Sequence, residues 1–91
     1  MYVYVNIYSD DNYNAKCNGV YMQPEDAIKA MRLFYRHDQN IVEIIKKHEE
    51  DMCEELTRDY LDDEVILNDY IMADECIIVD ENYRILKMEV C

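Results

Sequence analysis

The sequence predicts an α+β fold in which two antiparallel helices, at about residues 24–37 and 39–61, pack on a small, mainly antiparallel sheet. Three observations support this prediction. The second helical segment repeats apolar side chains at steps of three and four residues. The segments 2–8 and 84–90 alternate in the manner of half-buried strands. A single Gly and a single Pro leave the regular elements few interruptions.

The chain has 91 residues and is expected to form a single domain, 1–91. A domain of this size buries roughly 60 to 65% of its unfolded surface, enough for one core but not for a deep catalytic cavity as well. Apolar residues make up 51% of the chain, which disfavours intrinsic disorder. There is neither an apolar run near the roughly 20 residues of a membrane span nor a secretory signal at the N-terminus, so we expect a cytoplasmic protein.

The first predicted strand, residues 2–8 (YVYVNIY), has an aliphatic face and an aromatic face. We assign the aliphatic face to the core. The aromatic face either lies half-buried under a helix or loop, or forms an open surface of the kind that is enriched in protein interfaces. The aliphatic face consists of Val3, Val5 and Ile7, and the aromatic face of Tyr2, Tyr4, Asn6 and Tyr8.

Residues 9–22 are rich in Asp, Asn and other turn-forming residues. Asn18-Gly19 is a strong two-residue turn signal, which predicts a short hairpin in which residues 13–17 pair with residues 20–22. A segment of this kind can be a functional loop, although a simple connection between the first strand and the first helix explains it as well.

The first helix is expected to begin at Pro24, whose fixed φ and missing N–H suit the first helical position. Asp38 is a natural N-cap and separates the first helix from the second. The second helix is the longest predicted element. Its buried stripe comprises Ile41, Ile45, His48, Met52, Leu56 and Tyr60.

The C-terminal third predicts further strands at 76–80 and 84–90, joined by the turn Asp80-Glu81-Asn82. In the second of these strands Leu86, Met88 and Val90 are expected to point inward. Residues 64–67 either add a fourth strand or belong to a short third helix; we favour the strand.

The net charge of −12 is concentrated in the second half of the chain. Residues 1–48 hold six acidic and six basic side chains, which leaves the other 15 carboxylates and three cations to residues 49–91, a difference of −12. Such a charge disfavours nucleic acid and anionic membranes as ligands, and favours a basic protein as partner.

One row of carboxylates in the second helix, Asp51, Glu55 and Asp59, has no basic neighbour downstream. Glu43 with Lys47, and Glu54 with Arg58, are favourable i,i+4 pairs, whereas the row repeats like charges at the same spacing. Each like-charge step costs roughly 0.2 to 0.5 kcal/mol of helix stability. The row and its extension are the predicted partner-binding residues: Asp51, Glu55, Asp59, Asp62, Asp63 and Glu64.

No motif for catalysis, cofactor binding or metal binding is present. His48-Glu49 would begin a metalloprotease motif, but its second His is replaced by Met52. The four cysteines lack C-x-x-C spacing, and the carboxylates near residue 62 lack the Gly of a calcium loop. We therefore expect no enzymatic activity, no cofactor and no specific metal.

Two function classes remain. In the first, the acidic helix imitates nucleic acid and inhibits a basic, nucleic-acid-binding protein, since successive carboxylates at i,i+4 lie about 6 Å apart. The profile (small, very acidic, rich in Tyr, Asn and Ile) resembles phage-encoded anti-defence proteins such as anti-CRISPR or anti-restriction inhibitors. That resemblance is one of composition and assigns no residues; it implies action in the cytoplasm of a bacterial host.

The second class is a generic protein–protein interaction module: a homodimer, an assembly subunit or an antitoxin-like partner of a basic protein. In this class the acidic row provides solubility and electrostatic steering. The contact itself is made by the edge of the sheet or by the N-terminal tyrosines, with Tyr2, Tyr4 and Tyr8 as candidate partner-binding residues.

Overall fold

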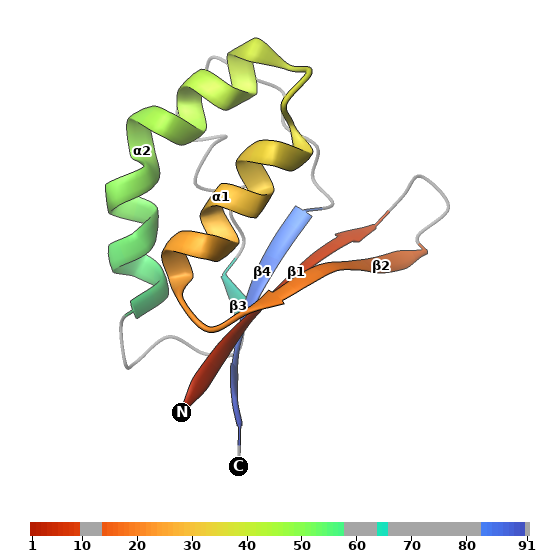
Figure 1. Ribbon diagram of the computed structural model, residues 1–91, viewed down its shortest axis with the longest axis vertical. Coiled ribbons are helices and arrows are strands. Elements are labelled where there is room, and N and C mark those ends of the chain that lie inside the picture. The colour runs from red at the N-terminus through yellow and green to blue at the C-terminus, as the bar shows by residue number, and fades with distance from the viewer. Residues whose placement is uncertain (10–13, 58–63, 66–82, 91) are drawn as a thin grey trace.

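The computed structural model describes residues 1–9, 14–57, 64–65 and 83–90. Its two helices pack on one face of an antiparallel sheet with the order β2-β1-β4-β3, which confirms the α+β fold (Figure 1). Both termini lie at the same end of the sheet, where the Val90 N–H donates to the Met1 carbonyl at 2.8 Å. The elements are β1 (Tyr2–Ser9), β2 (Ala15–Tyr21), α1 (Pro24–Phe34), α2 (Gln39–Thr57), β3 (Glu64–Val65) and β4 (Tyr83–Glu89).

The predicted starts of both helices are confirmed. Pro24 opens α1 directly after the extended residue Gln23. Asp38 precedes α2, and its Oδ1 atom accepts a hydrogen bond from the Ile41 N–H at 3.2 Å. Helix α1 ends at Phe34, earlier than the expected residue 37, because the chain tightens into a turn at Tyr35. The described part of α2 runs to Thr57, so the expected end at residue 61 lies outside the described residues.

The predicted hairpin within residues 13–22 is wrong. Residues 15–21 instead form one strand, β2, which pairs antiparallel with β1. Asn18 is the extra residue of a bulge opposite Asn6 and Ile7, and the following Gly19 has φ of 135°. The same Asn-Gly pair that favours a turn therefore forms a bulge here, because both structures use a positive φ at Gly.

The C-terminal strand predicted at 84–90 is confirmed as β4, and the candidate strand at 64–67 is present as β3. Strand β4 pairs with β1 along its whole length and with β3 on its other side. The strand predicted at 76–80 lies outside the described residues.

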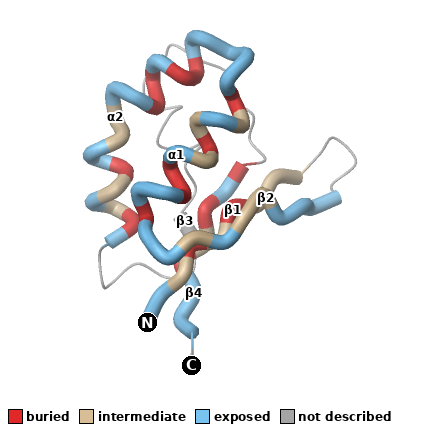
Figure 2. Tube along the Cα trace, viewed as in Figure 1, coloured by how far each residue is buried: buried red, intermediate tan, exposed pale blue. Residues whose placement is uncertain are grey.

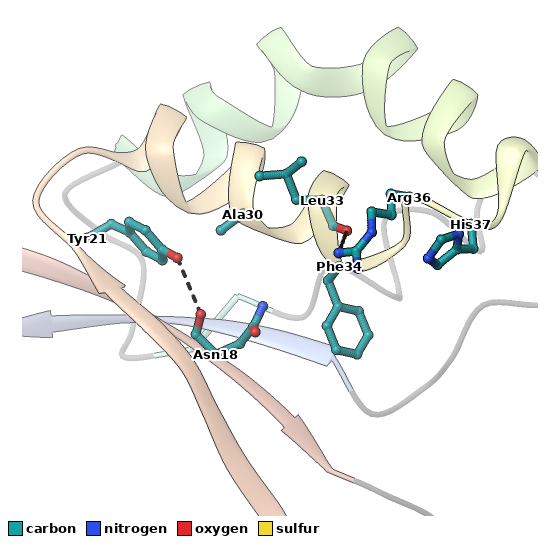
Figure 3. Close-up of a pocket in the computed structure, with 7 residues that line it drawn as sticks. All are labelled: Asn18, Tyr21, Ala30, Leu33, Phe34, Arg36 and His37. Atoms are coloured by element: carbon teal, nitrogen blue, oxygen red, sulfur yellow. Dashed lines mark hydrogen bonds between the residues drawn. The ribbon is translucent and has the colours of Figure 1, made fainter.

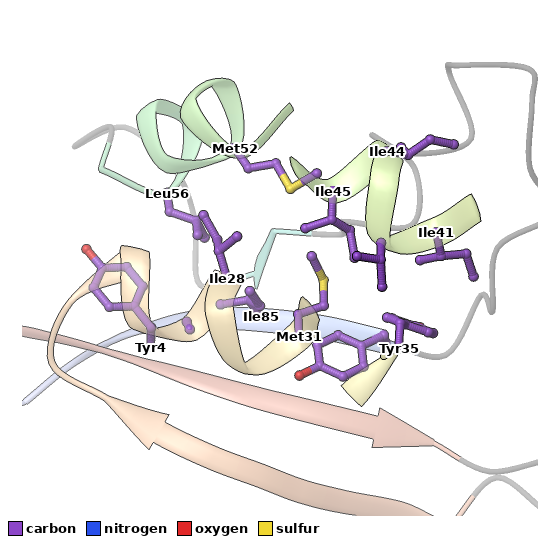
Figure 4. Close-up of a cluster of buried hydrophobic side chains, with 13 residues drawn as sticks. Tyr4, Ile28, Met31, Tyr35, Ile41, Ile44, Ile45, Met52, Leu56 and Ile85 are labelled. Atoms are coloured by element: carbon purple, nitrogen blue, oxygen red, sulfur yellow. The ribbon is translucent and has the colours of Figure 1, made fainter. Parts of the chain in front are cut away.

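The core lies between the two helices and the sheet (Figure 4). Four members of the predicted α2 stripe, Ile41, Ile45, Met52 and Leu56, are buried, whereas His48 is half-buried. In Figure 4 they point toward the side chains of α1 and toward the strands. The core cluster comprises Tyr4, Ala27, Ile28, Met31, Tyr35, Ile41, Val42, Ile44, Ile45, Met52, Leu56, Tyr83 and Ile85.

The assignment of the aliphatic faces of β1 and β4 to the core is wrong, whereas the alternative in which the aromatic face of β1 lies under a helix is confirmed for Tyr4 and Tyr8. The face of β1 that the helices cover carries Tyr4 and Asn6, both buried, whereas Val3, Val5 and Ile7 are only half-buried on the opposite face (Figure 2). Strand β4 behaves in the same way: Tyr83, Ile85 and Lys87 are buried, and Leu86 and Met88 are not. Hydrophobicity alone predicts the reverse arrangement.

A buried hydrogen-bond network explains why polar residues face the helices. Asn6 is fully buried, and its Nδ2 donates to the Ala27 carbonyl at 2.8 Å and to the Tyr83 hydroxyl at 2.9 Å. Asn18 donates to the same hydroxyl at 2.8 Å. The network connects α1 to three strands, and its bonds offset the desolvation of the Asn6 Nδ2 group and the Tyr83 hydroxyl, whereas the buried Asn6 Oδ1 atom has no hydrogen-bond partner among the described residues.

Candidate functional site

The outer half of α2 is acidic over its C-terminal turns. With 100° between successive residues of a helix, Glu50 and Glu54 lie opposite the buried stripe, and both are exposed. Glu49 falls on the flank nearest α1, while Asp51 and Glu55 fall on the other flank. With one residue from α1, these carboxylates form what we call the acidic surface: Glu25, Glu49, Glu50, Asp51, Glu54 and Glu55.

The flank nearest α1 joins carboxylates from both helices. Arg32 Nη1 lies 2.8 Å from Glu49 Oε2, with both side chains partly exposed. The Cys53 thiol donates to Glu25 Oε1 at 3.5 Å. Burial, the hydrogen bond to Glu25 and the charges of Glu25, Glu49 and Glu54 together raise the pKa of Cys53 from 9.0 to about 11. These carboxylates therefore gather around one thiol and make it a poor nucleophile at neutral pH.

Glu25 was missed as a site residue by the reasoning from sequence. Its position in the first turn of α1 is explained there by the helix dipole alone. The antiparallel arrangement of α1 and α2 places the start of α1 beside the C-terminal half of α2, and so adds this carboxylate to the surface (Figure 1). The prediction of two antiparallel helices was enough to place Glu25 beside the C-terminal half of the second helix.

The predicted carboxylate row lies on the other flank and is described only in part. Asp51 is well exposed, with His48 Nδ1 3.9 Å from its Oδ2 atom. Glu55 is half-buried. Glu64 is in β3, opposite Leu86 of β4. The remaining members of the prediction, Asp59, Asp62 and Asp63, lie outside the described residues.

The three candidate tyrosines of β1 do not form one exposed surface. Tyr4 is 6% exposed and belongs to the core. Tyr8 is half-buried and packs on Phe34, with the ring centroids 4.7 Å apart. Tyr2 is exposed, and the Lys87 amine lies 4.5 Å from the centre of its ring. Among the three, only Tyr2 is exposed, at 41%.

The sheet face opposite the helices is aliphatic, and we call it the open face. Residues directly opposite in an antiparallel pair lie on the same face. Val5 of the central strand β1 has Val20 on one side and Leu86 on the other. By the same register the open face comprises Met1, Val3, Val5, Ile7, Ser9, Ala15, Cys17, Val20, Glu64, Arg84, Leu86, Met88 and Val90.

A groove of about 450 Å³ lies between α1, β2 and the turn that follows α1 (Figure 3). On one side the Tyr21 hydroxyl donates to the Asn18 carbonyl at 3.3 Å. Arg36 and His37 lie at the end of the groove beyond Phe34, where they can attract an anion. Its described lining contains no Ser, Thr, Cys or carboxylate side chain, so it does not pair a nucleophile with its base.

Within the described ranges, no group of three or more His, Cys, Asp or Glu side chains is arranged to hold a metal ion. The described helices include none with the length and apolar composition that a bilayer crossing requires.

A scan against protein-family models finds no match to this sequence, and searches of curated proteins and of solved structures find none either. Functional inference therefore depends on the surfaces described above.

Proposed function

We propose that this protein is a small, non-enzymatic binding protein that inhibits a basic, nucleic-acid-binding partner. The observation that supports this most is the acidic surface, on which Glu50 and Glu54 are exposed one helical turn apart. A separation of about 6 Å along the helix is close to that of every second phosphate of a DNA strand. A channel lined with Arg and Lys would meet a comparable series of negative charges.

The surroundings of the acidic surface suit this role. Glu25 extends it onto α1, and Asp26 is exposed in the same first turn. Arg32 is bound to Glu49 and leaves the outermost carboxylates to a partner. The exposed cations Lys46 and Lys47, one turn earlier in α2, would help to orient the protein on a partner of mixed charge.

The partner class follows from charge. A chain of net charge −12 is repelled by phosphate groups, so the target is the nucleic-acid-binding protein and not its nucleic acid. Anti-CRISPR and anti-restriction inhibitors of phages are the functional type that fits this profile. Such a protein would act in the cytoplasm of a bacterial host, without a cofactor and without contact with a membrane.

The test is a comparison of immobilised wild-type protein with the triple variant Glu50→Gln, Asp51→Asn, Glu54→Gln in an extract of the native host. We expect the wild type to retain a nucleic-acid-binding protein that duplex DNA or RNA displaces and that elutes as salt rises from about 50 to about 500 mM. The triple variant should retain at least about tenfold less, because several charge contacts are lost together.

The matched control is Glu43→Gln with Glu89→Gln, which removes exposed carboxylates outside the acidic surface. It should retain the partner nearly as well as the wild type. Equal retention by the triple variant, or a retained protein that nucleic acid does not displace, would show that the acidic surface is not the binding site.

A second candidate function is the interaction module, in which this chain forms a homodimer or joins a larger assembly. The open face favours it, because an aliphatic surface of this extent on a small protein commonly marks a protein–protein contact.

A further inference from the structure

The open face has the composition of an interior. Ten of its thirteen described members are Val, Ile, Leu, Met, Cys or Ala, and the other three are Ser9, Glu64 and Arg84. In most antiparallel sheets one face packs on the core and the other, facing water, alternates to polar residues. Here the covered face carries the amide, phenol and amine groups, and the uncovered face carries the aliphatic side chains.

Solvent reaches this face most at its β2 side and at its ends, whereas Val3, Val5 and Ile7 of the central strand are half-buried. Val20 of β2 is 59% exposed, Met88 of β4 is 45% exposed, and Met1 and Val90 at the ends of β1 and β4 are 73% and 43% exposed. The described helices both lie on the other side of the sheet (Figure 1). Three strands about 4.8 Å apart and about eight residues long give a face of roughly 14 by 26 Å, as large as the apolar patches that commonly mark interaction sites.

Charge indicates what covers the face. The carboxylates of the acidic surface are on the helices, whereas the described members of the open face include one acidic residue, Glu64, and one basic residue, Arg84. A basic partner would therefore gain little from charge by docking on this nearly neutral face. A second copy of the chain, with its own charge of −12, is repelled from every acidic side and least from this one.

We propose that the open face is the interface of a homodimer, in which two sheets pack face to face about a twofold axis. Sheets in such sandwiches lie about 10 Å apart, with strands rotated by about 30° and aliphatic side chains interdigitated. A twofold contact uses the same patch on both copies, and this patch is centred on Val5 of the middle strand. The helices then form the two outer layers of the dimer.

This arrangement goes beyond the proposed function and is independent of it. Each acidic surface lies on α1 and α2, so the dimer presents two of them, directed away from each other. Two basic sites, or two copies of one partner, can then be engaged by a single dimer. Linked binding of that kind raises the overall affinity without any new contact.

The size of the face sets the expected strength of the dimer. Two faces with their rims bury on the order of 1,000 Å², near the lower limit of a specific interface. We therefore expect a reversible dimer with a dissociation constant on the order of 10 µM. Salt should strengthen it, because screening weakens the repulsion between two acidic chains. Binding through the acidic surface should weaken with salt, so the two proposals can fail separately.

The experiment is sedimentation equilibrium of the full chain from about 1 µM to about 1 mM, at low and at high salt. The variant Val20→Glu, Met88→Glu places two carboxylates on the open face at positions that are already exposed. The matched control, Leu33→Glu with Met22→Glu, adds the same charge at residues that are 63% and 55% exposed but do not belong to the open face. We expect the first pair to weaken the dimer at least tenfold and the second pair to change it less than threefold.

A second measurement covers the case in which the double variant folds poorly. In a mixture of isotope-labelled and unlabelled wild type, intermolecular NMR contacts should connect the methyl groups of Val20, Leu86 and Met88. A wild type that remains monomeric over the whole range overturns the proposal, even if its open face proves to be shielded by another part of the chain. A dimer that both variant pairs weaken equally, or one without these methyl contacts, overturns it as well.

Discussion

The two faces of the sheet differ in a way that reverses the usual rule. The face under the helices is built from Asn6, Tyr83 and Lys87 together with Tyr4 and Ile85, and it is buried. The open face is almost entirely aliphatic and in contact with solvent. Asn6 and Tyr83 lie inside because they form hydrogen bonds to each other, and Asn6 also bonds to α1. Burial on this sheet therefore follows hydrogen bonding more closely than hydrophobicity.

The difference between the two faces is tested most directly at two adjacent residues of β4. Ile85 is fully buried beneath the helices, and Ile85→Ala should lower the free energy of unfolding by about 3 to 4 kcal/mol through lost burial and a cavity. Leu86 points to the open face, and Leu86→Ala should cost only about 1 to 2 kcal/mol in dilute protein. Urea denaturation at low concentration measures both values. Equal costs would contradict the face assignment.

The next largest effect is expected in the buried network. Asn6→Leu keeps the volume of the side chain but removes the donors to the Ala27 carbonyl and the Tyr83 hydroxyl. We expect a loss of about 2 to 3 kcal/mol, because two buried hydrogen bonds are removed together, although the Tyr83 hydroxyl keeps its bond from Asn18. Val5→Thr, the opposite change at the neighbouring position, should cost under about 1 kcal/mol because that side chain faces the open side. A neutral Asn6→Leu in the same urea titration would show that the network does not hold the polar face in place.

Alkaline pH tests the buried network by removing the proton of the Tyr83 hydroxyl, without a substitution. Burial raises the pKa of Tyr83 from 10.0 to about 12, although hydrogen bonds from Asn18 and Asn6 lower it in part. The folded state holds the Tyr83 proton more tightly than the unfolded state does. The contribution of Tyr83 to the free energy of unfolding is therefore complete below pH 10 and is lost as the pH rises to about 12. A shift of this size corresponds to about 2 to 3 kcal/mol.

The measurement for Tyr83 is the urea midpoint between pH 9 and pH 12 for the wild type and for Tyr83→Phe, both in a Cys53→Ala background. The background is needed because the pKa of Cys53 is also raised, from 9.0 to about 11, which removes stability over a lower pH range. We expect the decline above pH 10 to be smaller in Tyr83→Phe. Identical declines would mean that Tyr83 ionises freely in the folded protein.

The smallest effect concerns the bulge that lets β2 place Asn18 on the covered side and Val20 on the open side. Gly19 has φ of +135°, and a Cβ atom there would lie 2.3 Å from the Tyr21 hydroxyl oxygen. Gly19→Ala should therefore cost about 1 to 2 kcal/mol. Ala15→Gly, an opposite change at the exposed start of β2, should cost less than about 1 kcal/mol. A Gly19→Ala protein as stable as the wild type would mean that the bulge relaxes without strain.

Much of the fold could be predicted because local patterns determine it. Pro24 and Asp38 mark the starts of the two helices, and the spacing of Ile41, Ile45, Met52 and Leu56 predicts the buried face of α2. The sheet faces could not be predicted in this way. Asn6 and Tyr83 are 77 residues apart, and only the folded topology shows that each can satisfy the other. The second strand was missed because a bulge and a turn share the same Asn-Gly signal.

The candidate site was predictable in part, for a similar reason. The periodicity of one helix predicts which carboxylates of α2 face outward, since that depends only on the 100° step. It does not show that Glu25 joins them, because that contact depends on how α1 lies against α2. The open face escaped prediction altogether, because aliphatic alternation was read as a sign of burial.

The two described cysteines differ in a way that bears on chemical labelling. Cys53 holds its proton well above neutral pH and lies half-buried among carboxylates, so its thiolate is scarce and alkylating reagents should modify it slowly. Cys17 is exposed on the open face, opposite Ile7. A fluorophore or spin label attached through Cys17 would therefore sit at the margin of the aliphatic surface, where its signal responds to whatever approaches that side of the sheet.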